Sequence, residues 1–222
     1  MAEIAGNMNI ETVTVGAFEV NCYVVWDQGR NALVIDPGAN PERIQKVIEA
    51  NRLKVSAYLI THGHADHIGA LPALHSAHPA PVAVSSKDAQ WAFLPINQLL
   101  PYYPALQSPP KVERLLSDGQ KWTDGELHYE VIATPGHSPG SVCFYFPDAH
   151  TLFAGDTLFQ GSVGRTDLPG GDPRVMSNSL KKLKSLPDDT KVFPGHGPET
   201  TIGIEKQTNF FMRGNSAAHG AG

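Results

Sequence analysis

The sequence contains little cysteine, no excess of basic residues and no long apolar run. Its 222 residues include 2 cysteines, and 17 Lys and Arg stand against 22 Asp and Glu, for a net charge of -5 at pH 7. This balance argues against a nucleic-acid partner and against an anionic membrane surface. No stretch approaches the length that crosses a bilayer, and the first residues lack the basic and apolar regions of a signal peptide. We therefore expect a cytoplasmic protein without a membrane partner.

The scarcity of cysteine also bears on cross-links and on domain structure. Cys22 and Cys143 are isolated in predicted strands, and we expect two buried thiols in a reducing compartment rather than a disulfide. With 41% hydrophobic residues, the chain has enough apolar side chains for a substantial core. We predict one domain over residues 1–212, followed by a flexible tail, rich in Gly, Ser and Ala, over residues 213–222.

Runs of β-branched and aromatic residues alternate along the chain with apolar residues at helical spacing. We predict strands at residues 9–16, 21–27, 32–36, 55–61, 81–85, 127–134, 141–146, 151–154 and 191–193. We predict helices at residues 41–51, 68–75, 174–186 and 204–211. Two β-rich segments, each followed by helices, predict an α/β fold in which two mixed β-sheets flanked by helices form an αββα sandwich.

Residues 87–110 differ from this pattern, because aromatic and leucine side chains crowd there among prolines. Two interpretations remain open. The segment either covers the mouth of an active site or forms a hydrophobic elbow that fills space between layers.

Four potential metal ligands fall within six residues, directly after the predicted strand 55–61. They are His62, His64, Asp66 and His67. Two histidines spaced by two positions point to different faces of a helix, so the first pair belongs on a loop. Asp66 is a suitable N-cap for a helix that begins near His67. The sequence therefore predicts a metal-binding loop that leads into a helix.

Three further loops place a potential ligand directly after a predicted strand. They contain Gly136-His137, Gly155-Asp156 and Gly195-His196. The glycine before each ligand permits close approach of the backbone. Loops at one edge of a sheet converge on one cleft. We therefore expect these side chains to join the first motif.

The string His62-x-His64-x-Asp66-His67 with these three loops resembles the metallo-β-lactamase superfamily, and the match covers nearly the whole chain in order. Segments 21–23, 34–38, 164–167 and 194–200 are most similar to its glyoxalase II-like, or hydroxyacylglutathione hydrolase-like, single-domain hydrolases. The resemblance implies two ion sites and a bridging carboxylate, with His62, His64 and His137 on one ion, Asp66, His67 and His196 on the other, and Asp156 between them. Imidazole and carboxylate ligands favour two divalent ions, zinc first, with iron or manganese as alternatives.

The implied activity is a dinuclear metallohydrolase that cleaves a small-molecule thioester, with a glutathione-linked substrate as one candidate. A water between two ions about 3.5 Å apart supplies hydroxide at neutral pH. A thiolate leaving group has a pKa of about 8.5, so no strong general acid is required. Asp66 and Asp156 are candidate catalytic residues that accept the released proton.

Two further residues have candidate roles beside the ligand set. Arg165 is a candidate to bind a substrate carboxylate, with a structural ion pair to Asp167 or Asp172 as the alternative. Asp36 is a candidate acceptor for the N–H of a ligand imidazole, with a turn cap as the alternative.

Other members of the superfamily provide competing interpretations. The persulfide dioxygenases, which bind one iron, share His62, His137, Asp156 and the segment 164–167. Asp156 stands where lactam-hydrolysing members that use Cys carry that thiol, which argues against β-lactam cleavage. Glyoxalase II proper carries much of its glutathione site on a C-terminal helical domain, and this sequence stops soon after its last ligand. The hydrolytic core is therefore implied, whereas the acyl group, the thiol carrier and the oligomeric state stay open.

Overall fold

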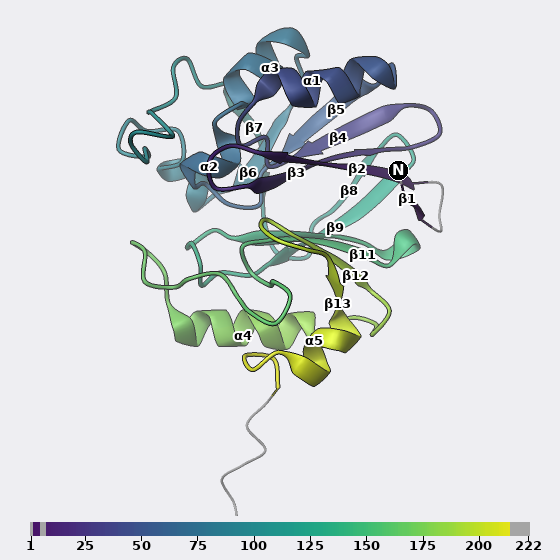
Figure 1. Ribbon diagram of the computed structural model, residues 1–222, viewed down its shortest axis with the longest axis vertical. Helices are drawn as coiled ribbons and strands as arrows, with labels where there is room; N and C mark the ends of the chain where they lie inside the picture. The colour runs from purple at the N-terminus through teal and green to yellow at the C-terminus, as the bar shows by residue number, and fades with distance from the viewer. Residues whose placement is uncertain (1, 5–7, 214–222) are drawn as a thin grey trace, which may run out of the picture.

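Two β-sheets lie face to face between two groups of helices in the computed structural model, which describes residues 2–4 and 8–213 (Figure 1). Among these residues the first sheet has strands β1 (Ala2–Ile4), β2 (Met8–Val15), β3 (Val20–Trp26), β4 (Asn31–Ile35), β5 (Lys54–Leu59), β6 (Val82–Ser85) and β7 (Val112–Leu116), in that order. The second sheet has the order β13 (Thr200–Thr201), β12 (Lys191–Pro194), β11 (Thr151–Gly155), β10 (Val142–Phe146), β9 (Leu127–Ala133) and β8 (Lys121–Asp124).

The helices cover the outer faces of the two sheets (Figure 1). Helices α1 (Pro41–Ala50), α2 (Ala65–Ile68) and α3 (Leu71–Ala77) belong to the first half of the chain. Helices α4 (Pro173–Leu183) and α5 (Ile202–Thr208) lie outside the second sheet. Two short 3-10 helices, η1 (Asp88–Gln90) and η2 (Pro147–Ala149), interrupt the loops. The predicted αββα arrangement is confirmed.

Both sheets are mixed, as predicted. Strands β4 to β7 pair in parallel and β1 to β4 pair antiparallel. In the second sheet β11 and β12 are parallel, and the other neighbouring strands pair antiparallel. The carboxyl ends of β5, β9, β11 and β12 lead into the four loops with potential ligands. The topology therefore decides which side chains can meet.

Alternation of side chains along the strands divides the core into three layers. In β3, Cys22 and Val24 pack towards α1 and α3, whereas Tyr23 and Val25 face the second sheet. Between the sheets the ring of Phe153 lies 5.0 Å from that of Tyr23, centroid to centroid. A third cluster packs α4 and α5 against the outer face of the second sheet. These layers hold both sheets rigid behind the loops.

Some predicted boundaries were wrong. Asp66 is not an N-cap, because the N-cap position of α2 belongs to His64 and Asp66 lies within that helix. The predicted helix 68–75 is divided at Gly69, where the carbonyl oxygen of Gly38 lies too close for any side chain. Strands β1, β7, β8 and β13 were not predicted, and each lies at the edge of its sheet.

Residues 87–110 are mostly turns and pack beside the His62 loop. The side chain of Asn97 donates to the carbonyl oxygens of Gly63 (2.7 Å) and Ala92 (2.6 Å). Ala92 and Tyr103 are buried, whereas Ile96 is 81% exposed. These contacts join the segment to the His62 loop, and both interpretations of its role stay open.

Cys22 and Cys143 are both buried free thiols, as predicted. Within residues 2–4 and 8–213, no helix has the length and apolar character needed to cross a membrane. Most of the predicted tail, residues 214–222, lies outside the described residues. The single-domain boundary at residue 212 stays a prediction.

Candidate metal centre

The seven predicted ligand side chains lie together at one edge of the sandwich, although they come from four separate loops. The first cluster contains ring nitrogens of His62, His64 and His137, all within 4.8 Å of one another. His64 uses Nδ1, which lies 2.9 Å from Nε2 of His137. Two imidazole nitrogens this close share one proton or, with lone pairs facing the same point, one cation.

The second cluster lies beside the first. It contains Asp66, His67 and His196, whose facing atoms also lie within 4.8 Å of one another. Oδ2 of Asp66 is 3.8 Å from Nε2 of His67 and 3.7 Å from Nε2 of His196. Asp66 and His67 lie in α2 and His196 follows β12, so the two sheets share this cluster.

Asp156 lies between the two clusters. Its Oδ2 is 3.5 Å from Nε2 of His137 in the first cluster and 3.5 Å from Nε2 of His196 in the second. Its Oδ1 is 3.5 Å from Nε2 of His67. The carboxylate therefore contacts both groups, which is the position that a bridging ligand requires.

The donor set fits divalent cations on two grounds. Within the described part of the chain, three buried atoms of this site lack a hydrogen-bond partner: Nε2 of His62, Nε2 of His67 and Oδ1 of Asp156. Buried polar atoms without partners are costly, so an absent group is expected to satisfy them. A tetrahedral ion with bonds of about 2.0–2.1 Å also places its ligand atoms roughly 3.4 Å apart, close to the distances around Asp156.

In four of the clustered imidazoles, the Nδ1 atom that faces away from the cluster has a hydrogen-bond partner. His67 Nδ1 is 3.0 Å from Asp36 Oδ2, and His62 Nδ1 is 3.0 Å from Thr61 Oγ1. Backbone carbonyl oxygens serve the other two rings, with Arg165 O at 2.7 Å from His137 Nδ1 and Phe18 O at 2.8 Å from His196 Nδ1. Such contacts fix the tautomer and the ring orientation of a ligand imidazole.

Asp36 has the role hypothesised from the sequence and a second one as well. Its carboxylate also accepts hydrogen bonds from the backbone N–H of Thr61 (2.8 Å) and from the hydroxyl of Thr61 (2.6 Å). One buried carboxylate therefore holds both His67 and the residue before His62.

The electrostatics of the site favour neutral imidazole at His62 and His64 and positive charge at His67. Burial and the neighbouring imidazoles, His67 first, lower the pKa of His62 well below its ordinary value. Burial and His137 lower the pKa of His64 to about 3. Burial acts in the same direction on His67, but the carboxylates of Asp156, Asp66 and Asp36 outweigh it and raise the pKa of His67 to about 10.

Strand β3 holds the His196 loop through Asn21 and Tyr23, which belong to the segment 21–23 of the family resemblance. The amide of Asn21 donates to the carbonyl oxygens of Pro194 (3.2 Å) and Gly197 (2.8 Å). The hydroxyl of Tyr23 donates to Pro194 O at 2.6 Å. Gly195 is required between them, because a side chain there would collide with Asp156 Oδ1.

The guanidinium of Arg165 has its hydrogen-bond partner in Asp167, outside the ligand cluster. Its guanidinium forms a two-pronged ion pair with Asp167, at 2.7 and 2.8 Å, and both side chains are exposed. Only its backbone carbonyl contacts the centre, through His137. The alternative of an ion pair with Asp167 is therefore the arrangement seen.

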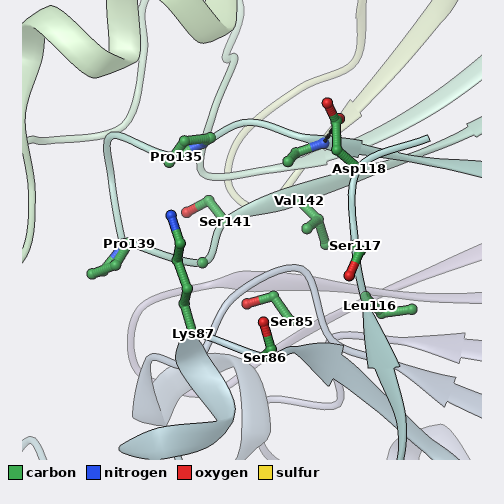
Figure 2. A pocket seen from close by; sticks show the side chains of 12 residues that line it. Ser85, Ser86, Lys87, Leu116, Ser117, Asp118, Pro135, Pro139, Ser141 and Val142 are labelled. Carbon is green, nitrogen blue, oxygen red and sulfur yellow. Dashed lines mark hydrogen bonds between the residues drawn. The ribbon is translucent and has the colours of Figure 1, made fainter. Parts of the chain in front are cut away.

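A pocket of ≈ 200 Å³ lies beside the His137 loop, and its lining includes none of the seven clustered side chains (Figure 2). Figure 2 shows Lys87, which follows β6, reaching into it towards Ser141, which precedes β10. The pocket is therefore separate from the seven clustered side chains.

Sequence reasoning missed one buried carboxylate near the centre, Asp88. It contacts both loops that form the first cluster. No motif surrounds it in the sequence, and it lies in the irregular segment 87–110.

Known proteins with similar sequences and folds carry the same architecture. Residues 15–196 match the model of the Metallo-beta-lactamase superfamily. The chain is 37% identical to "Hydroxyacylglutathione hydrolase GloC" of Haemophilus influenzae, covering 94% of this chain and 100% of that protein. It is similar to the BLEG-1 B3 metallo-beta-lactamase structure (37% identity, TM-score 0.88, 93% and 100% coverage). It is also similar to TTHA1623 in a di-iron-bound form (41% identity, TM-score 0.81, 90% and 99% coverage).

Proposed function

The chain belongs to the metallo-beta-lactamase superfamily, and we propose that it is a dinuclear metal-dependent hydrolase that cleaves thioesters. The observation that carries this proposal is Asp156, whose carboxylate contacts one histidine of the first cluster and two of the second. A carboxylate in that position fits two cations better than one. The seven clustered side chains are the proposed ligands.

The side chains of the site have separate roles in the proposed hydrolysis. When bound, two divalent ions supply hydroxide at neutral pH and stabilise the developing oxyanion. Asp66 lies at the second candidate ion position and Asp156 lies between the two, so either carboxylate can accept the proton released during attack. Asp36, Thr61 and two backbone carbonyls hold the imidazoles in place, and such contacts keep the centre preorganised.

The choice of a thioester follows from what surrounds the centre. A thiolate leaves without a strong general acid, and the proposed catalytic groups are ligand-type side chains. The Haemophilus relative is named a hydroxyacylglutathione hydrolase, and hydroxyacylglutathione is a glutathione thioester. We propose a small-molecule thioester as substrate, with a glutathione-linked acyl group as the first candidate. The two free thiols favour a reducing compartment such as the cytoplasm.

The proposal is tested by a substrate panel on metal-loaded protein. The panel contains glutathione thioesters, other thioesters, lactones, a β-lactam and glutathione persulfide. We expect free thiol to be released from one or more thioesters, without oxygen uptake. The β-lactam is included because one similar structure is a B3 metallo-beta-lactamase.

The alternative activity is a persulfide dioxygenase-like oxidation at one iron. Oxygen uptake with the persulfide, together with inert thioesters, would replace the proposed hydrolase by this alternative. Because TTHA1623 has a di-iron-bound form, the panel is run on protein loaded with iron as well as with zinc and with manganese.

We propose that Arg165 leaves its ion pair with Asp167 and binds a carboxylate of the substrate. The Arg165–Asp167 ion pair is exposed, and exposed ion pairs contribute little to stability, so a substrate can displace it. A charge-assisted hydrogen bond contributes about 1.5–3 kcal/mol. We expect Arg165→Ala to raise KM about 10-fold for glutathione thioesters, with little change in kcat.

Steady-state kinetics on two substrates checks this prediction. KM for an uncharged thioester should not change in Arg165→Ala, and Asp167→Asn should not raise KM for either substrate. Equal KM values for wild type and Arg165→Ala on the glutathione thioester would refute a role of Arg165 in substrate binding. Its ion pair with Asp167 would then be structural.

A further inference from the structure

Asp88 is a fully buried carboxylate in the short helix η1, at the carboxyl end of β6. Among the ion pairs formed by the described residues, none involves this side chain. A buried carboxylate without a cation must be stabilised by hydrogen bonds. The four donors that serve it all belong to segments at the first cluster.

Two of these donors come from the His62 side. The backbone N–H of Gly63, between His62 and His64, donates to Asp88 Oδ2 at 2.9 Å. The indole N–H of Trp91 donates to Asp88 Oδ1 at 3.3 Å. The ring of Trp91 lies 5.5 Å from the ring of His64. Asp88 therefore fixes the loop that carries two ligands.

The other two donors come from the His137 loop of the second sheet. The hydroxyl of Ser138 donates to Oδ2 at 2.6 Å, and the backbone N–H of Gly140 donates to Oδ1 at 2.7 Å. Ser85 and Ser141, on opposite sides of the neighbouring pocket in Figure 2, support this network. One oxygen, Oδ2, thus joins the residue after His62 to the residue after His137.

The second cluster has different supports. Asp36 holds His67, the carbonyl oxygen of Phe18 faces His196, and Tyr23 holds the His196 loop. Asp88 has no contact with these groups among its hydrogen bonds in the described residues. Asp36 serves both clusters, because it also holds Thr61 beside His62, whereas the hydrogen bonds of Asp88 reach the first cluster alone.

We propose that Asp88 is a positioning residue that sets the geometry of the His62, His64 and His137 site and not that of the second site. The inference rests on the metal centre of the proposed function. Removing an outer partner of a metal ligand lowers metal affinity about 10- to 100-fold. We expect Asp88→Asn to weaken the first site by that factor and to leave the second site within about 3-fold.

The test is a zinc titration of the full chain against a competing chelator, which gives two stepwise dissociation constants. NMR of ¹⁵N-labelled histidine rings shows which imidazoles bind at each step. In Asp88→Asn, the rings of His62, His64 and His137 should respond only at the higher zinc concentration. Tyr23→Phe, which removes the 2.6 Å hydrogen bond to Pro194, should weaken the second site instead.

Asp27→Asn is the matched control. Asp27 is 1% exposed and accepts hydrogen bonds from the backbone N–H groups of Asn31 and Glu126, both at 2.8 Å, at a turn that bears no ligand. The Asp27→Asn substitution likewise replaces a buried carboxylate by an amide, but far from any ligand loop, so both zinc dissociation constants should match those of wild type. Melting curves of the three variants show how much stability each one loses.

Three results would overturn the inference: unchanged constants in Asp88→Asn, equal weakening of both sites, or the same weakening in Asp27→Asn. A wild type that binds no zinc, iron or manganese would refute the proposed metal centre and this inference together. A wild type that binds two ions but cleaves no thioester would refute the proposed substrate. The role of Asp88 would then still be decided by the zinc titration of Asp88→Asn.

Discussion

Asp156→Ala is expected to abolish turnover and to lower metal content while the chain stays folded. The carboxylate contacts both clusters, so its loss removes the group that joins the two candidate ions. Metal-assisted stabilisation of a developing charge contributes several kcal/mol, so we expect kcat/KM to fall by about 10³-fold or more. Folding should persist, since Oδ1 of Asp156 accepts no hydrogen bond from the described protein groups.

The measurements are steady-state kinetics, metal analysis and circular dichroism on the same preparation. Asp148→Ala is the control, because Asp148 is exposed in η2, on the turn between β10 and β11. It should keep wild-type activity and metal content. Full activity in Asp156→Ala would refute the bridging assignment.

Removal of metal by a chelator is expected to eliminate activity without unfolding the two sheets. The hydrophobic layers of the sandwich are independent of the ligand loops, so the fold does not require the ions. An ion held at 100 times its Kd stabilises by about 2.7 kcal/mol. For a chain of this size that corresponds to a fall in Tm of about 5 to 10 °C for each ion that chelation removes.

Calorimetry and activity assays before and after chelation check this prediction. Zinc, iron or manganese should restore turnover, whereas magnesium should not, since it prefers an all-oxygen octahedral site. Undiminished turnover by the metal-free protein would remove the basis for a metallohydrolase.

The clustering of the seven side chains could be predicted because their residues form short motifs after apolar strands. His62, His137 and Asp156 each follow a strand, and the carboxyl ends of those strands meet at one edge. Backbone partners could not be predicted in this way. The carbonyl oxygens of Phe18 and Arg165 hold His196 and His137, and a carbonyl group carries no sequence signature.

Asp88 was missed for a related reason. It lies among aromatic and proline residues with no ligand spacing around it, and its role appears only when Gly63 and Ser138 from different sheets meet it. The same dependence on tertiary contacts explains Asp66, which was predicted as an N-cap. Its carboxylate lies beside His67 and His196, and α2 begins two residues earlier than the cap prediction required.

The most direct test is a crystal structure of metal-loaded protein with anomalous scattering measured at the metal edge. We expect two peaks about 3.5–4 Å apart, one among His62, His64 and His137, the other among Asp66, His67 and His196, with Asp156 between them. A single peak, or two peaks that Asp156 does not join, would contradict the dinuclear centre.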